Sequence, residues 1–168
     1  MHKYLERSDE LKNLEELVNG GVLNFDGIES PFFLLGLISA FENRYQAKAD
    51  NFFEEISWKQ FFAIICLNLC NENPTIKELS EIMGSSHQNV KQILNKLEDK
   101  GYIRIDFDKE DKRKQRVFLT EKTRAFCAEH DEGSKKIVEK IFEGIDEKDI
   151  QTVIRTFFQM EKNLEEVE

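Results

Sequence analysis

The sequence predicts a mainly helical protein that carries one small β-hairpin. Only two prolines and eight glycines occur among 168 residues, and frequent leucine, isoleucine, phenylalanine, glutamate and lysine favour helices. Two amphipathic segments, residues 76–83 and 86–100, lie on either side of Gly84, which is typical of two helices joined by a tight turn. After Gly101 the apolar residues alternate instead, and this pattern predicts strands.

Signals of helix starts divide the first half of the chain. Ser30 and Pro31 have the form of an N-cap and a first helical residue, and they predict a helix that runs to about Ala49. Residues 57–60 and 75–78 both have the capping-box pattern, a hydroxyl residue followed three positions later by Gln or Glu, so helices are expected to begin there. The apolar side of the second, short helix is expected to consist of Ile76, Leu79, Ile82 and Met83.

The helix predicted over residues 86–100 has two unlike faces. Its apolar stripe consists of Val90, Ile93, Leu94 and Leu97. The opposite face carries Gln88, Lys91, Gln92 and Asn95, with Asn89 and Lys96 beside it. A helix face that meets only water favours glutamate and lysine, whereas Asn89 and Asn95 are poor helix formers. This amide-rich face is therefore interpreted as a contact surface rather than a solvated one.

Two strands and two further helices are predicted after Gly101. The strands are YIRIDF, in which Ile103, Ile105 and Phe107 share one face, and RVFL, in which Val117 and Leu119 do the same. The segment between them, DKEDKRKQ, is too polar for a core and predicts an exposed loop at the tip of a hairpin. Thr120 and Asp146 are the expected N-caps of the following helices. The last helix has an apolar stripe of Ile150, Val153, Ile154, Phe157, Phe158 and Leu164.

Charge is distributed unevenly along the chain. The 24 basic and 33 acidic residues give a net charge of −9 at pH 7, which by itself argues against a nucleic-acid partner. Between Ser85 and Arg124, however, 11 basic residues stand against seven acidic ones, whereas the rest of the chain has 13 basic and 26 acidic residues. A basic segment on an acidic protein can neutralise phosphates locally, so DNA binding is compatible with this composition.

Other features argue against several classes of protein. The longest apolar run, residues 32–41, is too short for a membrane span, which needs about 20 residues. The N-terminal segment lacks the pattern of a secretory signal and the three cysteines fit a reducing compartment, so a cytoplasmic protein without membrane association is expected. The sequence has no recognisable phosphate loop, nucleophile motif or cluster of metal ligands, so no enzyme activity, cofactor or metal site is predicted.

A short helix, a turn, a second helix and a charged hairpin together predict a winged helix-turn-helix. At these residues the sequence resembles the MarR family of transcriptional regulators. The specific elements are LEDKGYI, DKEDKRKQRVFLT and the preceding helix SWKQFFAIICL, and a looser similarity runs from about Phe32 to Leu164. The resemblance implies that the flanking helices form a two-fold homodimer, that the partner is a pseudo-palindromic duplex operator, and that a small molecule can modulate binding.

The helix pair provides one set of candidate DNA contacts. The second helix of a helix-turn-helix enters the major groove, where Asn and Gln can pair with adenine and Lys can donate to guanine or phosphate. The candidate base contacts are Gln88, Asn89, Lys91, Gln92 and Asn95. Ser85 and Ser86, at the start of this helix, are expected to hold phosphate. Thr75, His87 and Lys96 complete the predicted set from the helices.

The hairpin, which is called the wing below, provides a second set of candidate DNA contacts. Its basic residues are Lys109, Lys112, Arg113, Lys114 and Arg116, and the last four are predicted DNA contacts. A narrow minor groove attracts an inserted guanidinium, and the resemblance places Arg113 there. Asp111 is expected to orient Arg113 by an ion pair and not to contact DNA itself.

These predictions divide the chain into four parts. They are an N-terminal extension with a short helix over residues 1–29, a dimerisation helix and linker over 30–55, the winged helix-turn-helix over 56–120, and C-terminal dimerisation helices over 121–168. The preferred function is a dimeric, sequence-specific DNA-binding transcriptional regulator, of repressor type and modulated by a small-molecule ligand. The alternative is a winged-helix module that binds another protein and not DNA, for which the net negative charge is the argument.

The mode of regulation is the least readable feature. Aromatic residues at the predicted junction of the dimerisation helix and the winged domain are interpreted mainly as core, and they do not indicate a particular ligand. They are Phe32, Phe33, Tyr45, Phe52, Phe53, Trp58, Phe61 and Phe62. Cys66 and Cys70 continue an apolar face and are also interpreted as core. A thiol sensor is disfavoured because no cysteine precedes Cys66, although Cys127 would qualify if it were exposed and acidified.

Overall fold

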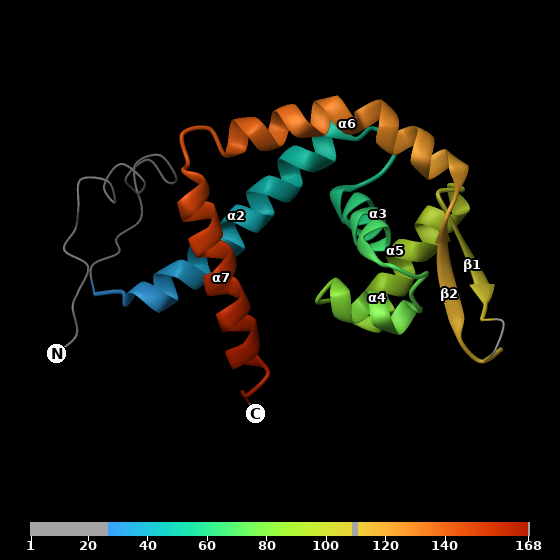
Figure 1. Cartoon of the computed structure of the whole chain (residues 1–168), viewed down its shortest axis with the longest axis horizontal. Helices are drawn as coiled ribbons and strands as arrows, with labels where there is room; N and C mark the ends of the chain where they lie inside the picture. The colour runs from blue at the N-terminus through green and yellow to red at the C-terminus, as the bar shows by residue number, and fades with distance from the viewer. Residues whose placement is uncertain (1–26, 109–110, 168) are drawn as a thin grey trace. The chain divides into compact units, whose positions relative to one another are not determined.

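The computed structural model describes residues 27–108 and 111–167 of the chain (Figure 1). The helix expected near residues 9–19 and the wing residues Lys109 and Glu110 lie outside these ranges. The described elements are α2 (Ser30–Phe52), α3 (Trp58–Leu69), α4 (Ile76–Ile82), α5 (His87–Asp99), β1 (Ile103–Phe107), β2 (Gln115–Leu119), α6 (Glu121–Ile141) and α7 (Glu147–Leu164). The predicted fold class, mainly helical with a winged helix-turn-helix, is confirmed.

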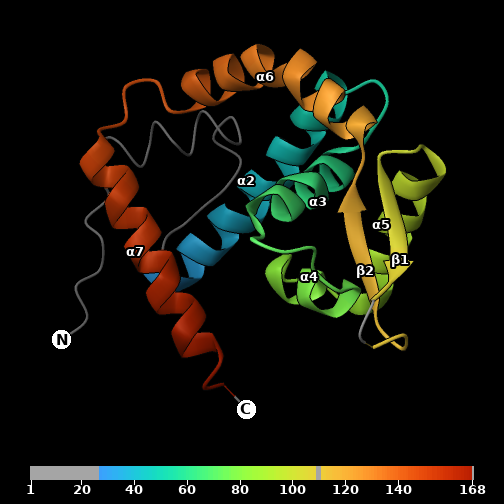
Figure 2. The same ribbon diagram turned by 45° about the vertical axis from the view of Figure 1, so that its right-hand side comes forward.

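The chain divides into two compact units, one that ends at Phe118 and one that begins at Leu119. In the first unit, α3, α4 and α5 pack together beside the hairpin (Figures 1 and 2). Their shared core contains buried side chains from every one of these elements. These side chains are Ala63, Ile64, Leu79, Val90, Leu94, Leu97, Ile103 and Val117. The apolar stripe predicted for α5 therefore faces this core.

Both predicted capping boxes are present. The Ser57 hydroxyl accepts a hydrogen bond from the Gln60 amide at 3.3 Å, and the Gln60 side chain accepts one from the Ser57 amide at 3.0 Å. Thr75 and Glu78 make the same pair of bonds at 3.2 and 2.7 Å. Each box satisfies two amide groups that a helix start leaves without a helical partner, so α3 and α4 begin where the sequence predicts.

Loss of the cap at α3 is expected to destabilise the protein modestly. Ser57→Ala should lower the free energy of unfolding by about 1 kcal/mol, because the Gln60 amide loses its acceptor. Urea denaturation at one fixed protein concentration should show a lower midpoint with an unchanged slope. Ser57→Thr retains the hydroxyl and serves as the matched control. Equal destabilisation by both substitutions would contradict the capping role.

Two glycines shape the turns around α5. Gly84 has φ of +57° and Gly101 has φ of +76°, in the left-handed region that side chains with a Cβ rarely adopt. After Gly84 the chain returns so that the Ser85 amide donates to the Ser80 carbonyl at 3.0 Å. After Gly101 the Tyr102 amide donates to the Leu97 carbonyl at 2.9 Å. The tight glycine turn between α4 and α5 and the end of α5 at Gly101 match the predictions.

The start and end of α2 differ from the prediction. The helix begins at Ser30 with Glu29 as its N-cap, so the assignment of Ser30 as N-cap is wrong by one residue. Proline fits throughout the first helical turn, where amide groups have no helical partner, and therefore does not distinguish the two registers. The helix also continues to Phe52, where the adjacent aromatic rings of Phe53 and Phe61 pack against each other at the junction with α3.

Other corrections lie at the ends of elements. Ile82, at the end of α4, is 50% exposed, and Phe107, at the end of β1, is 64% exposed, although both were placed on apolar faces. Periodicity assigns a residue to a face, but whether the core extends that far depends on the neighbouring elements. Asp146 precedes α7 as predicted, yet within the described structure its side chain makes no capping hydrogen bond.

The hairpin is joined to the segment before α4. The Val117 amide donates to the Pro74 carbonyl at 2.9 Å, and Thr75 and Arg116 form an isolated antiparallel bridge. Strand β2 therefore pairs with β1 on one side and with this short extended segment on the other. This pairing attaches the wing to the start of α4.

The second unit consists of α6 and α7, between which the chain turns sharply (Figures 1 and 2). Thr120 caps α6 by accepting a hydrogen bond from the Thr123 amide at 3.4 Å, as predicted. Most of the stripe predicted on α7 is exposed, from 38% at Phe157 to 72% at Phe158, whereas Ile150 is half-buried. Among the residues that the structure describes, no helix combines the length and apolar character that a bilayer span requires.

Candidate nucleic-acid interface

The outward face of α5 is exposed along its whole length. Between His87 and Lys96 the exposed side chains are those of His87, Gln88, Asn89, Lys91, Gln92, Asn95 and Lys96. All of them were predicted DNA contacts, and they lie on the side of α5 opposite its buried stripe. They provide amide, imidazole and ammonium groups that can form hydrogen bonds with base edges or phosphates.

The start of α5 is already hydrogen-bonded within the protein. The Ser86 hydroxyl accepts a bond from the Asn89 amide at 3.3 Å and so caps the helix. The Asn89 side-chain amide donates to the Ser85 hydroxyl at 2.8 Å. These bonds orient Asn89, and they leave each serine hydroxyl its own hydrogen as a donor toward a phosphate.

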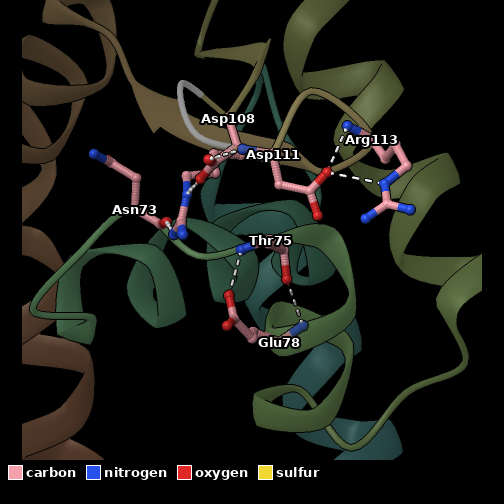
Figure 3. A network of polar contacts seen from close by, with 7 residues as sticks. Asn73, Thr75, Glu78, Asp108, Asp111 and Arg113 are labelled. Carbon is pink, nitrogen blue, oxygen red and sulfur yellow. Dashed lines mark hydrogen bonds and ion pairs between the residues drawn. The ribbon is translucent and has the colours of Figure 1, made fainter.

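In the wing, Asp111 and Arg113 form the predicted ion pair. One carboxylate oxygen, Oδ1 of Asp111, accepts bonds from both the backbone amide and the side-chain Nε of Arg113, each at 3.1 Å (Figure 3). The Arg113 side chain is 91% exposed, whereas that of Asp111 is 31% exposed. Hydrogen bonds from Arg113 lower the pKa of Asp111, so the carboxylate remains charged at neutral pH. Arg113 is thus an exposed guanidinium held at its base.

Residues from three elements line one hollow of about 550 Å³ between α4, α5 and the wing. Five predicted DNA contacts are among them: Thr75, His87, Lys91, Arg113 and Lys114. The structure therefore brings the N-terminal half of α5 and the basic tip of the wing together. Glu78 and Glu81 also line the hollow, but Glu78 is engaged in its capping box and Glu81 forms an ion pair with Lys77 at 3.8 Å.

Arg116 differs from the other predicted contacts. Its Nη1 donates to the backbone carbonyl of Asn73 at 2.7 Å, and its Nε forms an ion pair with Asp108. Its side chain is 30% exposed, compared with 91% for Arg113. Lys112 and Lys114, by contrast, are exposed as expected.

Sequence reasoning missed these contacts of Arg116. Asp108 and Arg116 flank the loop at the tip of the hairpin, and opposite charges in such positions often pair across strands. That signal was present in the sequence. The contact with Asn73 had no comparable signal, because it depends on how β2 lies against the segment before α4.

The cysteines do not have the environment of reactive thiols. Cys66 is buried, and Cys70 and Cys127 are half-buried. Burial raises the pKa of the Cys66 and Cys127 thiols, which is the opposite of the acidification that a thiol sensor needs. Within residues 27–108 and 111–167, no group of three or more His, Cys, Asp or Glu side chains could hold a metal ion.

The aromatic residues at the junction of α2 and α3 mostly pack on one another. Tyr45 and Trp58 meet edge to face with ring centroids 4.7 Å apart, and Phe53 lies 4.4 Å from Phe61. Phe32, at the start of α2, is 69% exposed and does not share this arrangement. The interpretation of these residues as core is therefore supported for the cluster but not for Phe32.

The fold and the site define a winged helix-turn-helix protein. Residues 63–114 match the model of the MarR family, so the helix-turn-helix and the wing tip are those of a MarR-family protein. Similar solved structures confirm the fold. A MarR/EmrR family transcriptional regulator from Acinetobacter sp. ADP1 aligns with a TM-score of 0.74 at 18% identity, over 86% of this chain and 100% of that one.

Two other similar structures are of proteins whose partners are named. Streptococcus pneumoniae FabT in complex with DNA has a TM-score of 0.60 and 26% identity, over 83% of this chain and 100% of its own. Bordetella bronchiseptica BpsR, whose DNA binding is regulated by 6-hydroxynicotinic acid, has a TM-score of 0.67 and 15% identity, over 83% of this chain and 97% of its own.

Proposed function

We propose that the protein is a homodimeric, sequence-specific DNA-binding transcriptional regulator of repressor type that acts in the cytoplasm. The observation that carries this proposal is the joint arrangement of α5 and the wing. α5 and the exposed Arg113 belong to one compact unit, and His87 and Lys91 of α5 border the same hollow as Arg113. FabT, a structural relative at 26% identity, has been crystallised with DNA, which supports a duplex as the partner.

The proposal divides the contacts into two kinds. Gln88, Lys91, Gln92 and Asn95 would read base edges in the major groove, since their side chains are exposed and can donate or accept there. Ser85, Ser86, Thr75, Lys112 and Lys114 would hold phosphates and set the position of α5. Arg113 would enter the adjacent minor groove with Asp111 holding its base.

The proposed homodimer would cover apolar surface on α2, α6 and α7. On α7, Val153, Ile154, Phe158 and Leu164 are between 41% and 72% exposed, and on α2 the same is true of Phe32, Leu35 and Phe41, at 53% to 69%. Large apolar side chains exposed together on one helix are typical of interaction surfaces. A two-fold pairing would bury it and place two copies of α5 toward two half-sites of a pseudo-palindromic operator.

Modulation by a small molecule is the remaining part of the proposal. A hollow of about 470 Å³, in the size range of ligand sites, lies between the α2–α3 loop and α5. Asn89, Gln92 and Lys96 of α5 are among its lining residues, so a ligand bound there would compete directly with DNA. BpsR shows that a structural relative is regulated by a small aromatic acid.

Titration of the purified protein with duplex DNA from upstream of its own gene, and with a random duplex, tests the proposal. Fluorescence anisotropy at several salt concentrations should show tighter binding to the upstream duplex and a linear loss of log affinity with log salt. The alternative, a winged-helix module for protein binding, predicts no measurable affinity for either duplex. Absence of binding to both would reject the DNA-binding function.

Variants on α5 should separate base reading from anchoring. Gln92→Ala or Asn95→Ala should weaken binding to the specific duplex by about 1 to 3 kcal/mol, because base contacts provide discrimination. Binding to the random duplex should change little, since it depends on phosphate contacts. Lys122→Ala removes an exposed cation outside the predicted contact set and serves as a control. Equal losses on the two duplexes would contradict base reading by these residues.

A further inference from the structure

A continuous set of hydrogen bonds connects the segment before α4 to the tip of the wing. It begins at the Asn73 carbonyl, which accepts a bond from Nη1 of Arg116 at 2.7 Å. Nε of the same guanidinium pairs with Oδ2 of Asp108, at the opposite side of the wing loop. Arg116 therefore connects two segments that are 35 positions apart, Asn73 and Asp108.

The connection continues from Asp108 to Arg113. The other oxygen of Asp108, Oδ1, accepts a bond from the Asp111 amide at 2.9 Å. Asp111 in turn holds the backbone and the side chain of Arg113 through its own Oδ1, each bond 3.1 Å long. Figure 3 shows Asn73, Asp108, Asp111 and Arg113 in this order along the network, with the Thr75–Glu78 capping box beside it. Each carboxylate thus positions the next residue toward the tip.

The surroundings of Arg116 are unsuited to a phosphate contact. Its charge is paired with Asp108, whose side chain is only 11% exposed. The hydrogen bond that Arg116 donates to Asp108 raises the pKa of Arg116, and the charges of Glu78 and Glu72 act in the same direction. A phosphate would have to approach a cation that already has a carboxylate partner and lies among further acidic groups. Arg113 also has a carboxylate partner, Asp111, but its side chain is 91% exposed, compared with 30% for Arg116.

We propose that Arg116 is a positioning residue that anchors the wing and thereby places Arg113, and that it is not itself a DNA contact. This inference rests on the proposed function insofar as Arg113 contacts DNA. The anchoring itself needs a planar group with donors in two directions, one toward the Asn73 carbonyl and one toward Asp108. Lysine carries the charge but lacks this fork, so Arg116→Lys should restore the anchor only in part.

The first measurement combines Arg116→Gln with Arg113→Ala in operator titrations against salt. Arg116→Gln alone should weaken operator binding roughly tenfold. In the Arg113→Ala background the same substitution should cost less than about twofold and leave the salt slope unchanged, because the residue that it positions is already absent. The matched control, Lys114→Gln, removes an exposed cation two positions away and should lower the slope by about one in either background.

A second variant should change operator affinity in opposite directions for the two possible roles of Arg116, a phosphate contact and an anchor of the wing. Asp108→Asn removes one negative charge near the DNA and weakens the hold on Arg116. If Arg116 contacted phosphate, this variant should bind the operator more tightly, since the guanidinium would be released and a repulsive charge removed. If Arg116 anchors the wing, the variant should bind several-fold more weakly. Thermal unfolding of each variant establishes that it is folded before binding is compared.

Hydrogen exchange tests the anchor without DNA. The amides of Asp111 and Lys114 donate within the wing, to Asp108 and to the Asp111 carbonyl, each at 2.9 Å. In Arg116→Gln they should exchange several-fold faster, with partial recovery in Arg116→Lys, while the buried amides of α5 remain protected. Unchanged exchange in the wing would overturn the inference, whether or not the protein binds DNA.

The outcomes also distinguish the two proposals. A wild-type protein that binds no duplex rejects the proposed function, and wing exchange then decides the anchor alone. The inference is overturned if the wild-type protein binds the operator and the effects of Arg116→Gln and Arg113→Ala on affinity are fully additive, with a further fall of about one in the salt slope. Arg116 would then be a phosphate contact.

Discussion

Phe157→Glu is expected to dissociate the proposed homodimer and to weaken operator binding by at least about a hundredfold. Phe157 lies in the middle of the apolar stripe of α7, and a buried carboxylate there would have no charged partner in the proposed interface. A monomer engages only one half-site and loses the gain from two linked binding events, which ranges from about 10² to 10⁴. Sedimentation at micromolar concentration and anisotropy on one operator measure the two effects.

Gln159→Glu is the matched control for this prediction. It adds the same carboxylate to α7 two residues later, about 200° around the helix, on the polar side. This variant should remain dimeric and bind the operator within a few-fold of the parent. A wild-type protein that sediments as a stable monomer would reject the dimer, and equal effects of both variants would show that net charge rather than the apolar stripe is responsible.

Arg113→Ala should weaken operator binding roughly ten- to a hundredfold and lower the salt slope by about one, as expected for the loss of one cationic contact. The guanidinium is 91% exposed at the tip of the wing, where the enhanced negative potential of a narrow minor groove would stabilise it. Arg113→Lys should recover only part of the loss, because lysine keeps the charge but not the planar fork that Asp111 holds. Anisotropy titrations on one duplex measure all variants.

Asp111→Ala provides the sharper contrast at the same site. If charge alone mattered, removal of an acidic residue beside DNA should strengthen binding. If Asp111 holds the backbone and side chain of Arg113, as the two bonds of 3.1 Å indicate, its removal should weaken binding severalfold. Binding as tight as that of the parent protein would reject the positioning role of Asp111 while leaving the contact by Arg113 open to its own test.

Features set by neighbouring residues were predictable from the sequence. The capping boxes at Ser57 and Thr75 need only two residues three positions apart, and both are present. The stripe of Val90, Leu94 and Leu97 follows from the helical repeat, and the pair of Asp111 and Arg113 from a spacing of two in a tight loop. Such features depend on local backbone geometry, which a short stretch of sequence specifies.

The depth of burial was less predictable. Ile82 and Phe107 follow the apolar pattern of their elements and are nevertheless exposed. The pattern gives the direction of a side chain, whereas burial requires another element to cover it. For the stripe on α7 the same distinction decides between a monomer with exposed apolar surface and the proposed homodimer.

The sequence by itself determined the helix pair, its turn at Gly84, the outward face of α5 and the basic wing with its Asp111–Arg113 pair. Only the tertiary structure decided the surroundings of Arg116. From the sequence alone, Arg116 could not be distinguished from the neighbouring basic residues as a predicted DNA contact. Its partners, Asn73 and Asp108, come from segments that meet because β2 pairs with the stretch before α4. Charge and residue type are local properties, but the availability of a guanidinium for DNA depends on which distant groups already bind it.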